Sequence, residues 1–253
     1  MSLVESFNLS GKTALVTGGT KGIGGAIAWG LAQAGADIAV VSRKPDASLA
    51  EKFEQLGRRF FHHQADLTQR KAIKAVVPAV REAMGEVDIL VNNAGICLRA
   101  PVLEFSESDW DSTIEINLTA AFLLTQAAGA HMLSRGWGKV INVASVLAYQ
   151  GGLNIPAYVA AKHGLAGLTK AFANDWAGKG VCVNAIAPGY FSTELTRDLE
   201  QDAERYQAIL ARIPAGRWGT GKDIAGLALF LASPASDYVN GAVLAVDGGW
   251  LGR

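Results

Sequence analysis

Residues 13–24 read Thr-Ala-Leu-Val-Thr-Gly-Gly-Thr-Lys-Gly-Ile-Gly, an apolar run that passes directly into a glycine-rich turn. The run predicts a buried strand, and the residues after the turn have the composition of a helix. Glycine allows a backbone to approach a pyrophosphate closely, and the amino end of a helix supplies free N–H groups and a positive dipole end. Because the spacing is Gly-x-x-x-Gly-x-Gly, the turn alone is also compatible with a plain strand-to-helix connection that binds nothing.

Outward from this turn, short apolar runs alternate with helical stretches along the whole chain. Several runs are continuous Val, Ile, Leu and Ala, as in parallel strands that are covered on both faces. Strands are predicted at residues 13–17, 38–41, 59–64, 89–92, 139–143, 181–187 and 243–246, and helices at 23–33, 69–84, 109–134, 155–177 and 223–231. This alternation predicts a single α/β domain, residues 1–253, with a doubly wound sheet.

The composition excludes several classes of protein. The chain has 253 residues, half of them hydrophobic, and its 23 Lys and Arg balance 23 Asp and Glu, which argues against a nonspecific nucleic-acid binder. No apolar run is long enough for a transmembrane helix, and the first residues lack the pattern of a signal peptide. Cys97 and Cys182 match neither a metal spacing nor a disulfide framework. We therefore expect a cytoplasmic protein without a metal site.

The irregular segment at residues 188–217 follows the sixth predicted strand and contains a polar, charged helix. Open α/β sheets bind their ligands beside the loops that follow the carboxyl ends of the strands. A segment of this length in that place predicts a lid over a substrate.

Basic residues lie where a dinucleotide would meet the protein. Arg43 follows Ser42 at the end of the second predicted strand, and Lys21 lies inside the glycine turn. A site selective for NAD places an acidic residue near this position, to bind the ribose 2′-hydroxyl. A guanidinium instead binds a 2′-phosphate. The pattern favours NADP(H) as the cofactor, with NAD as the second choice; the alternative is that both cations are ordinary surface residues.

Polar residues typical of catalysis follow the next strands. Residues 92–95 read Asn-Asn-Ala-Gly, Ser145 closes the fifth strand, and Tyr158 precedes Lys162 by one helical turn. The phenol and the ammonium therefore share a helix face, and a neighbouring cation lowers the pKa of a tyrosine toward a useful range. A surface Tyr/Lys pair is the plain alternative. A serine hydrolase is disfavoured because Ser145 lacks the flanking glycines of a nucleophile elbow.

With these residues, and with Asp66, Asn117 and a Pro-Gly turn at 188–189, the chain resembles the short-chain dehydrogenase/reductase family over essentially its whole length. The resemblance implies a seven-stranded parallel Rossmann sheet, hydride transfer between NAD(P) and an alcohol/ketone pair, and a homotetramer. It also implies that Tyr158 exchanges the proton, that Ser145 binds the substrate oxygen, that Lys162 holds the nicotinamide ribose and depresses the tyrosine pKa, and that Asn117 anchors a water. The cofactor-binding residues predicted in this way are Gly18, Thr20, Lys21, Gly22, Ile23, Gly24, Ser42, Arg43, Asp66, Leu67, Asn93, Gly95, Tyr158, Lys162, Pro188, Gly189, Phe191 and Thr193.

Within the family, residues 104–110, 213–219 and 235–241 resemble the 2-deoxy-D-gluconate 3-dehydrogenases, also called 2-dehydro-3-deoxy-D-gluconate 5-dehydrogenases. This resemblance implies a keto sugar acid of the deoxygluconate or ketodeoxyuronate type. Such a substrate needs a cation for its carboxylate and polar partners for its hydroxyls. Besides Ser145, the candidate substrate-binding residues are Arg99, Gln150, Arg217 and Arg253.

The apolar neighbours of Arg99, such as Leu98, keep other activities open. The alternatives within the class are a general carbonyl reductase, a gluconate 5-dehydrogenase and a 3-oxoacyl-carrier-protein reductase. An alternative of a different class is a protein that senses NADP(H) without turning anything over. The complete set Asn117, Ser145, Tyr158 and Lys162 argues against that reading, because a sensor has no use for acid–base residues.

Overall fold

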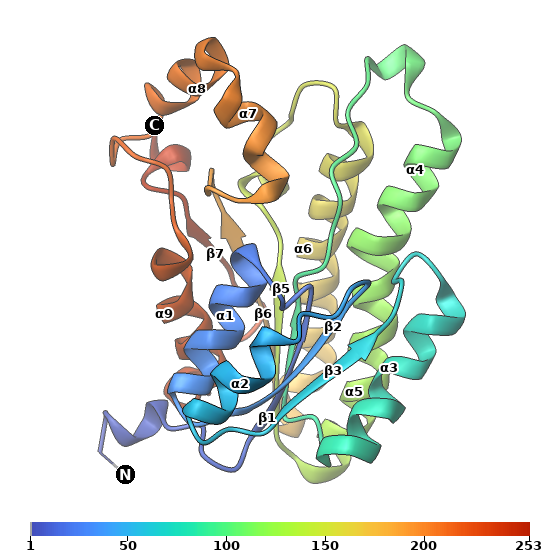
Figure 1. Ribbon diagram of the computed structural model, residues 1–253, viewed down its shortest axis with the longest axis vertical. Helices are drawn as coiled ribbons and strands as arrows, with labels where there is room; N and C mark the ends of the chain where they lie inside the picture. The colour runs from blue at the N-terminus through green and yellow to red at the C-terminus, as the bar shows by residue number, and fades with distance from the viewer. Residues whose placement is uncertain (1) are drawn as a thin grey trace.

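The apolar runs form one seven-stranded sheet with helices packed on both faces, as the computed structural model shows (Figure 1). The structure describes residues 2–253. The strands lie in the order β3-β2-β1-β4-β5-β6-β7, and neighbouring strands pair in parallel. The predicted doubly wound Rossmann sheet is confirmed, and each strand end lies within one residue of its prediction. The strands are β1 Thr13–Thr17, β2 Asp37–Ser42, β3 Phe60–Gln64, β4 Ile89–Asn92, β5 Gly138–Val143, β6 Val181–Pro188 and β7 Val243–Val246.

The helices form two layers, each with its own hydrophobic core against the sheet. On one face α1, α2 and α9 bury Ile27, Phe53 and Ile224, and on the other face α3, α5 and α6 bury Ile73, Leu124 and Ala173. Helix α4 packs against α6. The helices are α1 Gly22–Gln33, α2 Ser48–Gln55, α3 Arg70–Met84, α4 Glu107–Ile114, α5 Ala120–Arg135, α6 Pro156–Trp176, α7 Arg197–Gln201, α8 Ala203–Leu210 and α9 Gly221–Ala232.

Two features of the helices differ from the sequence prediction. Helix α2 was not expected; its sequence is mostly polar, and it is held on the sheet by Leu49 and Phe53. The predicted helix at 109–134 is interrupted by a wider turn, Glu115–Thr119, with π-type hydrogen bonding. The hydrophobic period of a helix does not reveal a single inserted residue, and such turns are frequent at functional sites.

The strand order creates a crevice at the carboxyl ends of β1 and β4. From β1 the chain passes to β2 on one side, whereas from β4 it passes to β5 on the other. Open parallel sheets bind ligands outside such a switch point. Thr17 and Asn92, which end these two strands, therefore place the glycine turn and the Asn-Asn-Ala-Gly segment side by side.

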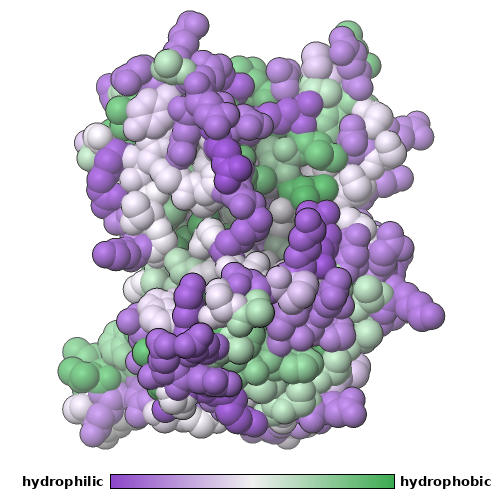
Figure 2. Space-filling model, in the orientation of Figure 1, coloured by the Kyte–Doolittle hydropathy of each residue, from purple (hydrophilic) through white to green (hydrophobic). Residues whose placement is uncertain are grey.

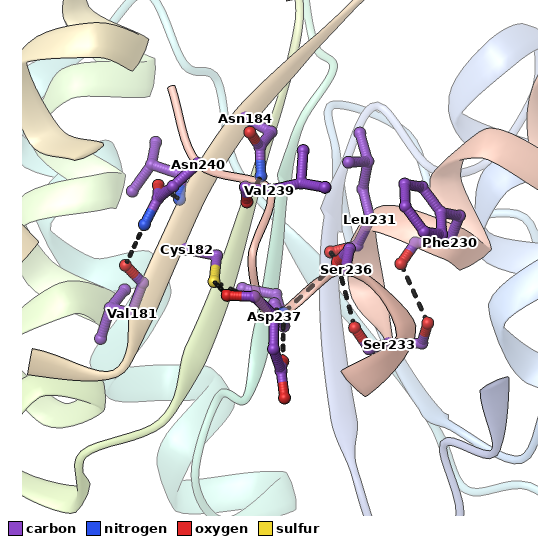
Figure 3. A network of polar contacts seen from close by, with 12 residues as sticks. Val181, Cys182, Asn184, Phe230, Leu231, Ser233, Ser236, Asp237, Val239 and Asn240 are labelled. Atoms are coloured by element: carbon purple, nitrogen blue, oxygen red, sulfur yellow. Dashed lines mark hydrogen bonds and ion pairs between the residues drawn. The ribbon is translucent and has the colours of Figure 1, made fainter. Parts of the chain in front are cut away.

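The opposite end of the sheet is fixed by a buried polar network before β7 (Figure 3). The Asn184 side chain donates to the carbonyl of Val239 at 2.7 Å, and Ser236 Oγ donates to the carbonyl of Leu231 at 3.1 Å. Lys139, only 1% exposed, donates to Asp237 Oδ1 at 2.7 Å. These contacts neutralise a buried cation and hold the connection from α9 to β7, so we assign them to the fold rather than to a site.

The segment between β6 and α9 folds into α7 and α8, which lie above the carboxyl end of the sheet in Figure 1. Its apolar residues form a small separate core in which Leu199, Ile213 and Trp218 pack with Trp250 near the end of the chain. The helical character predicted within 188–217 is therefore present; its action as a lid stays a prediction. In the described part of the chain, no helix combines the length and the apolarity needed to cross a membrane.

Candidate active site

The glycine turn forms a cradle that side chains would close. Gly18 and Gly22 have φ angles of +64° and +57°, a region that favours glycine. A Cβ on Gly18 would lie 2.9 Å from the amide nitrogen of Asn93, so the turn needs glycine there. Helix α1 begins without a side-chain cap, which leaves its first N–H groups directed at the turn. This geometry fits a pyrophosphate, the central group of a nicotinamide dinucleotide.

Asn93 holds this cradle from the neighbouring strand. Its side-chain amide donates to the carbonyl of Thr17 at 2.9 Å, and its backbone N–H donates to Thr17 Oγ1 at 2.9 Å. The structure thus brings the predicted Asn93 to the cofactor turn, where it orders the backbone.

The predicted cations lie at the outer end of the crevice, in different surroundings. Lys21 is ion-paired with Glu194, which lies in the Glu194–Thr196 helical turn after β6. No carboxylate of residues 2–253 pairs with Arg43, although its charge acts on Asp66. The pKa of Asp66 is lowered chiefly by hydrogen bonds from Thr68, and Arg43 adds to this effect. A cavity of about 370 Å³ adjoins Lys21 between the turn and α2.

The remaining predicted cofactor residues lie around the same crevice. Ser42 donates its hydroxyl to the carbonyl of Lys44 at 2.7 Å, at the end of β2. Leu67 is buried beneath the crevice, and Phe191 is buried at the base of the segment after β6. Thr193 lies 3.7 Å from the point where a Cβ on Gly22 would stand, so the Pro188–Thr193 segment reaches the glycine turn.

Three side chains from β5 and α6 meet beside this crevice. Ser145 lies two residues beyond the end of β5 and is 8% exposed; its hydroxyl accepts the backbone N–H of Leu147 at 3.1 Å, and its hydrogen bonding also lowers the pKa of the Tyr158 phenol. Lys162 lies one helical turn after Tyr158, and its ammonium is 5.3 Å from the centre of the tyrosine ring. It donates to the carbonyl of Val143 at 2.7 Å. The structure therefore brings the predicted Ser, Tyr and Lys together.

The electrostatics of this cluster differ from the sequence expectation. Burial raises the pKa of Tyr158 well above its ordinary value, and the Ser145 hydrogen bond and the charge of Arg99 only partly oppose the rise. Burial also lowers the pKa of Lys162 to about 8. Lys162 lies 5.3 Å from the centre of the ring and donates to the Val143 carbonyl, and its lowering of the tyrosine pKa stays a prediction. Arg99 is the cation that acts in this direction.

Asn117 lies in the π-type turn and faces the same crevice. Its side-chain amide donates to the carbonyls of Ile96 and Thr113, both at 2.9 Å, while its buried Oδ1 has no partner. Gly95 lies directly against this oxygen, where any side chain would collide with it. Asn117 and Lys162 also line an enclosed cavity of about 10 Å³. A space of this size suits a single water, and Oδ1 is a ready acceptor for it.

The candidate substrate residues are placed differently from one another. Arg99 is exposed and its charge acts on Tyr158, so it lies at the catalytic cluster. Arg217 instead forms a two-pronged ion pair with Asp223, at 2.6 and 2.9 Å. Arg253 donates to the carbonyl of Ala211 at 2.8 Å. Gln150 is half-buried just beyond the Val146–Ala148 turn. The structure thus leaves Arg99 exposed, with its charge acting on Tyr158, and ties two of the other candidates to the protein.

Sequence reasoning missed two members of this region. Cys97, for which the sequence indicated neither a metal site nor a disulfide, is half-buried, and its charge state influences both Tyr158 and Lys162. Tyr190 packs between Trp218 and Trp250, with ring centres at 5.4 and 4.7 Å. In the sequence, the one indication for a role of Tyr190 was its position directly after the Pro-Gly turn.

The surface of the molecule is hollowed beside these residues. Figure 2 shows the hollow between the α7–α8 segment and the segment before α4, with hydrophobic residues inside and hydrophilic ones around the rim.

Comparison with known proteins agrees with this geometry. A family model described as enoyl-(acyl carrier protein) reductase matches residues 18–251. The chain is 54% identical to the 2-dehydro-3-deoxy-D-gluconate 5-dehydrogenase of Bacillus subtilis (strain 168), over 99% of both chains. It is 43% identical to the gluconate 5-dehydrogenase of Gluconobacter oxydans (strain 621H), over 98% of both. The crystal structure of a gluconate 5-dehydrogenase from Burkholderia cenocepacia J2315, in complex with NADP and tartrate, superposes with a TM-score of 0.95 at 42% identity, over 100% of both chains.

Proposed function

Because this chain belongs to the short-chain dehydrogenase/reductase family, we propose that it is an NADP(H)-dependent oxidoreductase that interconverts an alcohol and a ketone on a keto sugar acid. The observation that carries the proposal is the cluster of Ser145, Tyr158 and Lys162, placed beside a glycine cradle that fits a pyrophosphate. Relatives that act on gluconate and deoxygluconate support the substrate class. NAD remains the second choice of cofactor.

Tyr158, Ser145 and Asn117 each have a separate role in the reaction. Bound NADPH supplies the hydride, and the protein must orient the carbonyl and deliver a proton to its oxygen. The raised pKa of Tyr158 keeps the phenol protonated, which is the form that donates. Ser145 donates a second hydrogen bond to the same oxygen, where negative charge develops. Asn117 holds a water through its unpartnered Oδ1. This water returns a proton to Tyr158 after the phenol has donated its own.

A substrate panel tests this function. NADPH oxidation is followed with 5-keto-D-gluconate, a 5-keto-4-deoxyuronate, a neutral ketohexose and an acetoacetyl thioester. We expect the two keto sugar acids to have the highest kcat/KM. A preference for the thioester would indicate a 3-oxoacyl reductase, and equal rates with all ketones would indicate a general carbonyl reductase. NADPH binding without turnover of any compound would indicate a sensor and would contradict the proposal.

We further propose that the chain assembles as a homotetramer. Phe122 is 37% exposed on α5 and stacks on Phe172 of α6, at 5.9 Å between ring centres. Trp176 extends this row at 4.6 Å from Phe172. β7 is an edge strand whose outer side has no partner strand in the described sheet. An aromatic helix face and an open sheet edge suit two different self-interfaces. Light scattering at micromolar concentration tests this; a stable monomer would contradict it.

A further inference from the structure

The proposed substrate carries a carboxylate, and the segment after β6 contains arginines whose partners can be compared. This inference rests on the proposed function. Arg217 is neutralised by Asp223, and Arg253 is bound to the carbonyl of Ala211. Among residues 2–253, no carboxylate pairs with Arg212. The segment therefore keeps at least one guanidinium available for an anion.

Arg212 is held in place by an aromatic ring. Its guanidinium carbon lies 3.9 Å from the centre of the Trp250 ring. Trp250 is 4% exposed, and the turn that carries it is fixed by Asp247, whose carboxylate accepts the backbone N–H groups of Gly249 and Leu251, both at 2.9 Å. A guanidinium stacked on an indole loses little further freedom when it binds, and the N–H groups at its edge remain directed outward.

Ring geometry places Arg212 near Tyr190: the Trp250 ring on which Arg212 stacks has its centre 4.7 Å from that of Tyr190, and Trp250 shares an apolar cluster with Val146, the residue after Ser145. Burial raises the pKa of the Tyr190 phenol, and the charges of Arg212, Arg99 and Arg205 all oppose the rise. Arg99 acts in the same way on Tyr158. No aspartate or glutamate contributes at either tyrosine; at Tyr158 the thiol of Cys97 adds to the rise in pKa. The charges of Arg212 and Arg99 therefore both act on Tyr190, and the adjacent rings of Trp250 and Tyr190 connect Arg212 with the segment that follows β6.

We propose that Arg212, stacked on Trp250, is a specificity-determining residue that binds the carboxylate of the substrate opposite Arg99. The two guanidinium groups approach the site from different segments, one before α4 and one after α8. The charge of Arg99 acts on Tyr158, whereas Arg212 is stacked on Trp250, next to Tyr190. A chain-like sugar acid, whose carboxylate is several carbons away from the keto group, can reach an outer cation of this kind.

The test compares the full-length wild type with Arg212→Gln on 5-keto-D-gluconate and on a neutral ketohexose. We expect KM for the acid to rise about 10- to 100-fold, since a charge-assisted hydrogen bond is lost, with kcat little changed and the neutral ketose unaffected. Arg212→Lys should recover part of the loss. Arg197→Gln is the matched control, because it removes the same charge from the same segment beside Glu194, 3.8 Å away. It should leave the ratio of acid to neutral kcat/KM unchanged.

Binding of D-gluconate to the NADP⁺-loaded protein, measured by calorimetry, gives a readout without turnover. The Arg212→Gln variant should weaken it by the same factor as KM. Equal losses on acid and neutral substrates, or no loss on either, would overturn the inference and leave the proposed function intact. A wild type that reduces no keto sugar acid and binds no gluconate would overturn both.

Discussion

Lys21 in the glycine turn is ion-paired with Glu194, a residue of the first helical turn after β6. The pair spans 173 residues of sequence and joins the two segments that border the predicted phosphate sites. A 2′-phosphate would meet the same ammonium, so the carboxylate of Glu194 competes with it. The strength of NADP(H) binding therefore depends on a residue outside the glycine turn.

The first prediction concerns this competition. Glu194→Gln should tighten NADPH binding by up to about fivefold, because an exposed ion pair contributes about 0–1 kcal/mol. Binding of NADH should not change, since it has no 2′-phosphate. Lys21→Gln should weaken NADPH binding selectively. Fluorescence titration of the three purified proteins with each cofactor gives six dissociation constants; equal changes for both cofactors would show that the pair acts only on the fold of the segment.

The second prediction concerns Arg43, which no described carboxylate neutralises. The wild type should prefer NADPH to NADH by about tenfold or more in kcat/KM, as expected for a guanidinium that contacts a phosphate. Arg43→Asp should reverse the preference, because the substitution removes the attraction and adds repulsion. Steady-state kinetics with each cofactor decide the matter. An NADH preference in the wild type would mean that Arg43 is an ordinary surface cation.

The third prediction concerns the proton donor. Tyr158→Phe keeps the ring and removes the hydroxyl, so kcat should fall by about 10²- to 10⁴-fold, while the dissociation constant of NADPH changes little. Tyr238→Phe is the matched control, since Tyr238 is fully exposed to solvent. It should behave as the wild type. A Tyr158→Phe variant that keeps more than about a tenth of wild-type kcat would refute the assignment.

The parts of this molecule that the sequence predicted are those with a periodic signal. Continuous apolar runs identify buried parallel strands, and the four-residue spacing of Tyr158 and Lys162 puts both on one face of α6. The π-type turn around Asn117 escaped prediction, because one extra residue in a helix leaves the apolar period almost unchanged. Helix α2 escaped because its two apolar contacts, Leu49 and Phe53, are too few to define a period.

Of all the features of the site, the ion pairs between side chains were the hardest to predict from the sequence. The sequence made Arg217 a candidate for binding the substrate carboxylate, but in the structure it is ion-paired with Asp223. The sequence pattern also gave no indication that Lys21 pairs with Glu194. Whether an arginine is free or neutralised depends on which distant segments meet. The pKa values depend on burial in the same way, so the sign of the shift at Tyr158 could not be obtained from spacing. The lid, the cytoplasmic location and the tetramer stay predictions.

The last prediction is the pH dependence, which follows from the pKa shifts of Tyr158 and Lys162. Reduction requires the protonated phenol, and the raised pKa of Tyr158 preserves this form as pH increases. The group that titrates first is then Lys162, with a pKa of about 8. Its charged form is lost as pH rises through that value. We therefore expect kcat/KM for reduction to be level below pH about 8 and to fall above it. Oxidation requires the phenolate, so its rate should still increase there.

Lys162→Arg separates this explanation from a titration elsewhere. A guanidinium stays protonated at every accessible pH, so the variant keeps a positive charge beside the Tyr158 ring when lysine has lost its own. Its kcat falls because the longer, planar group does not reproduce the hydrogen bond to the Val143 carbonyl. The shape of the profile is therefore the informative quantity. If the decline near pH 8 disappears in Lys162→Arg, the charge of Lys162 controls it; if the decline persists unchanged, another group does.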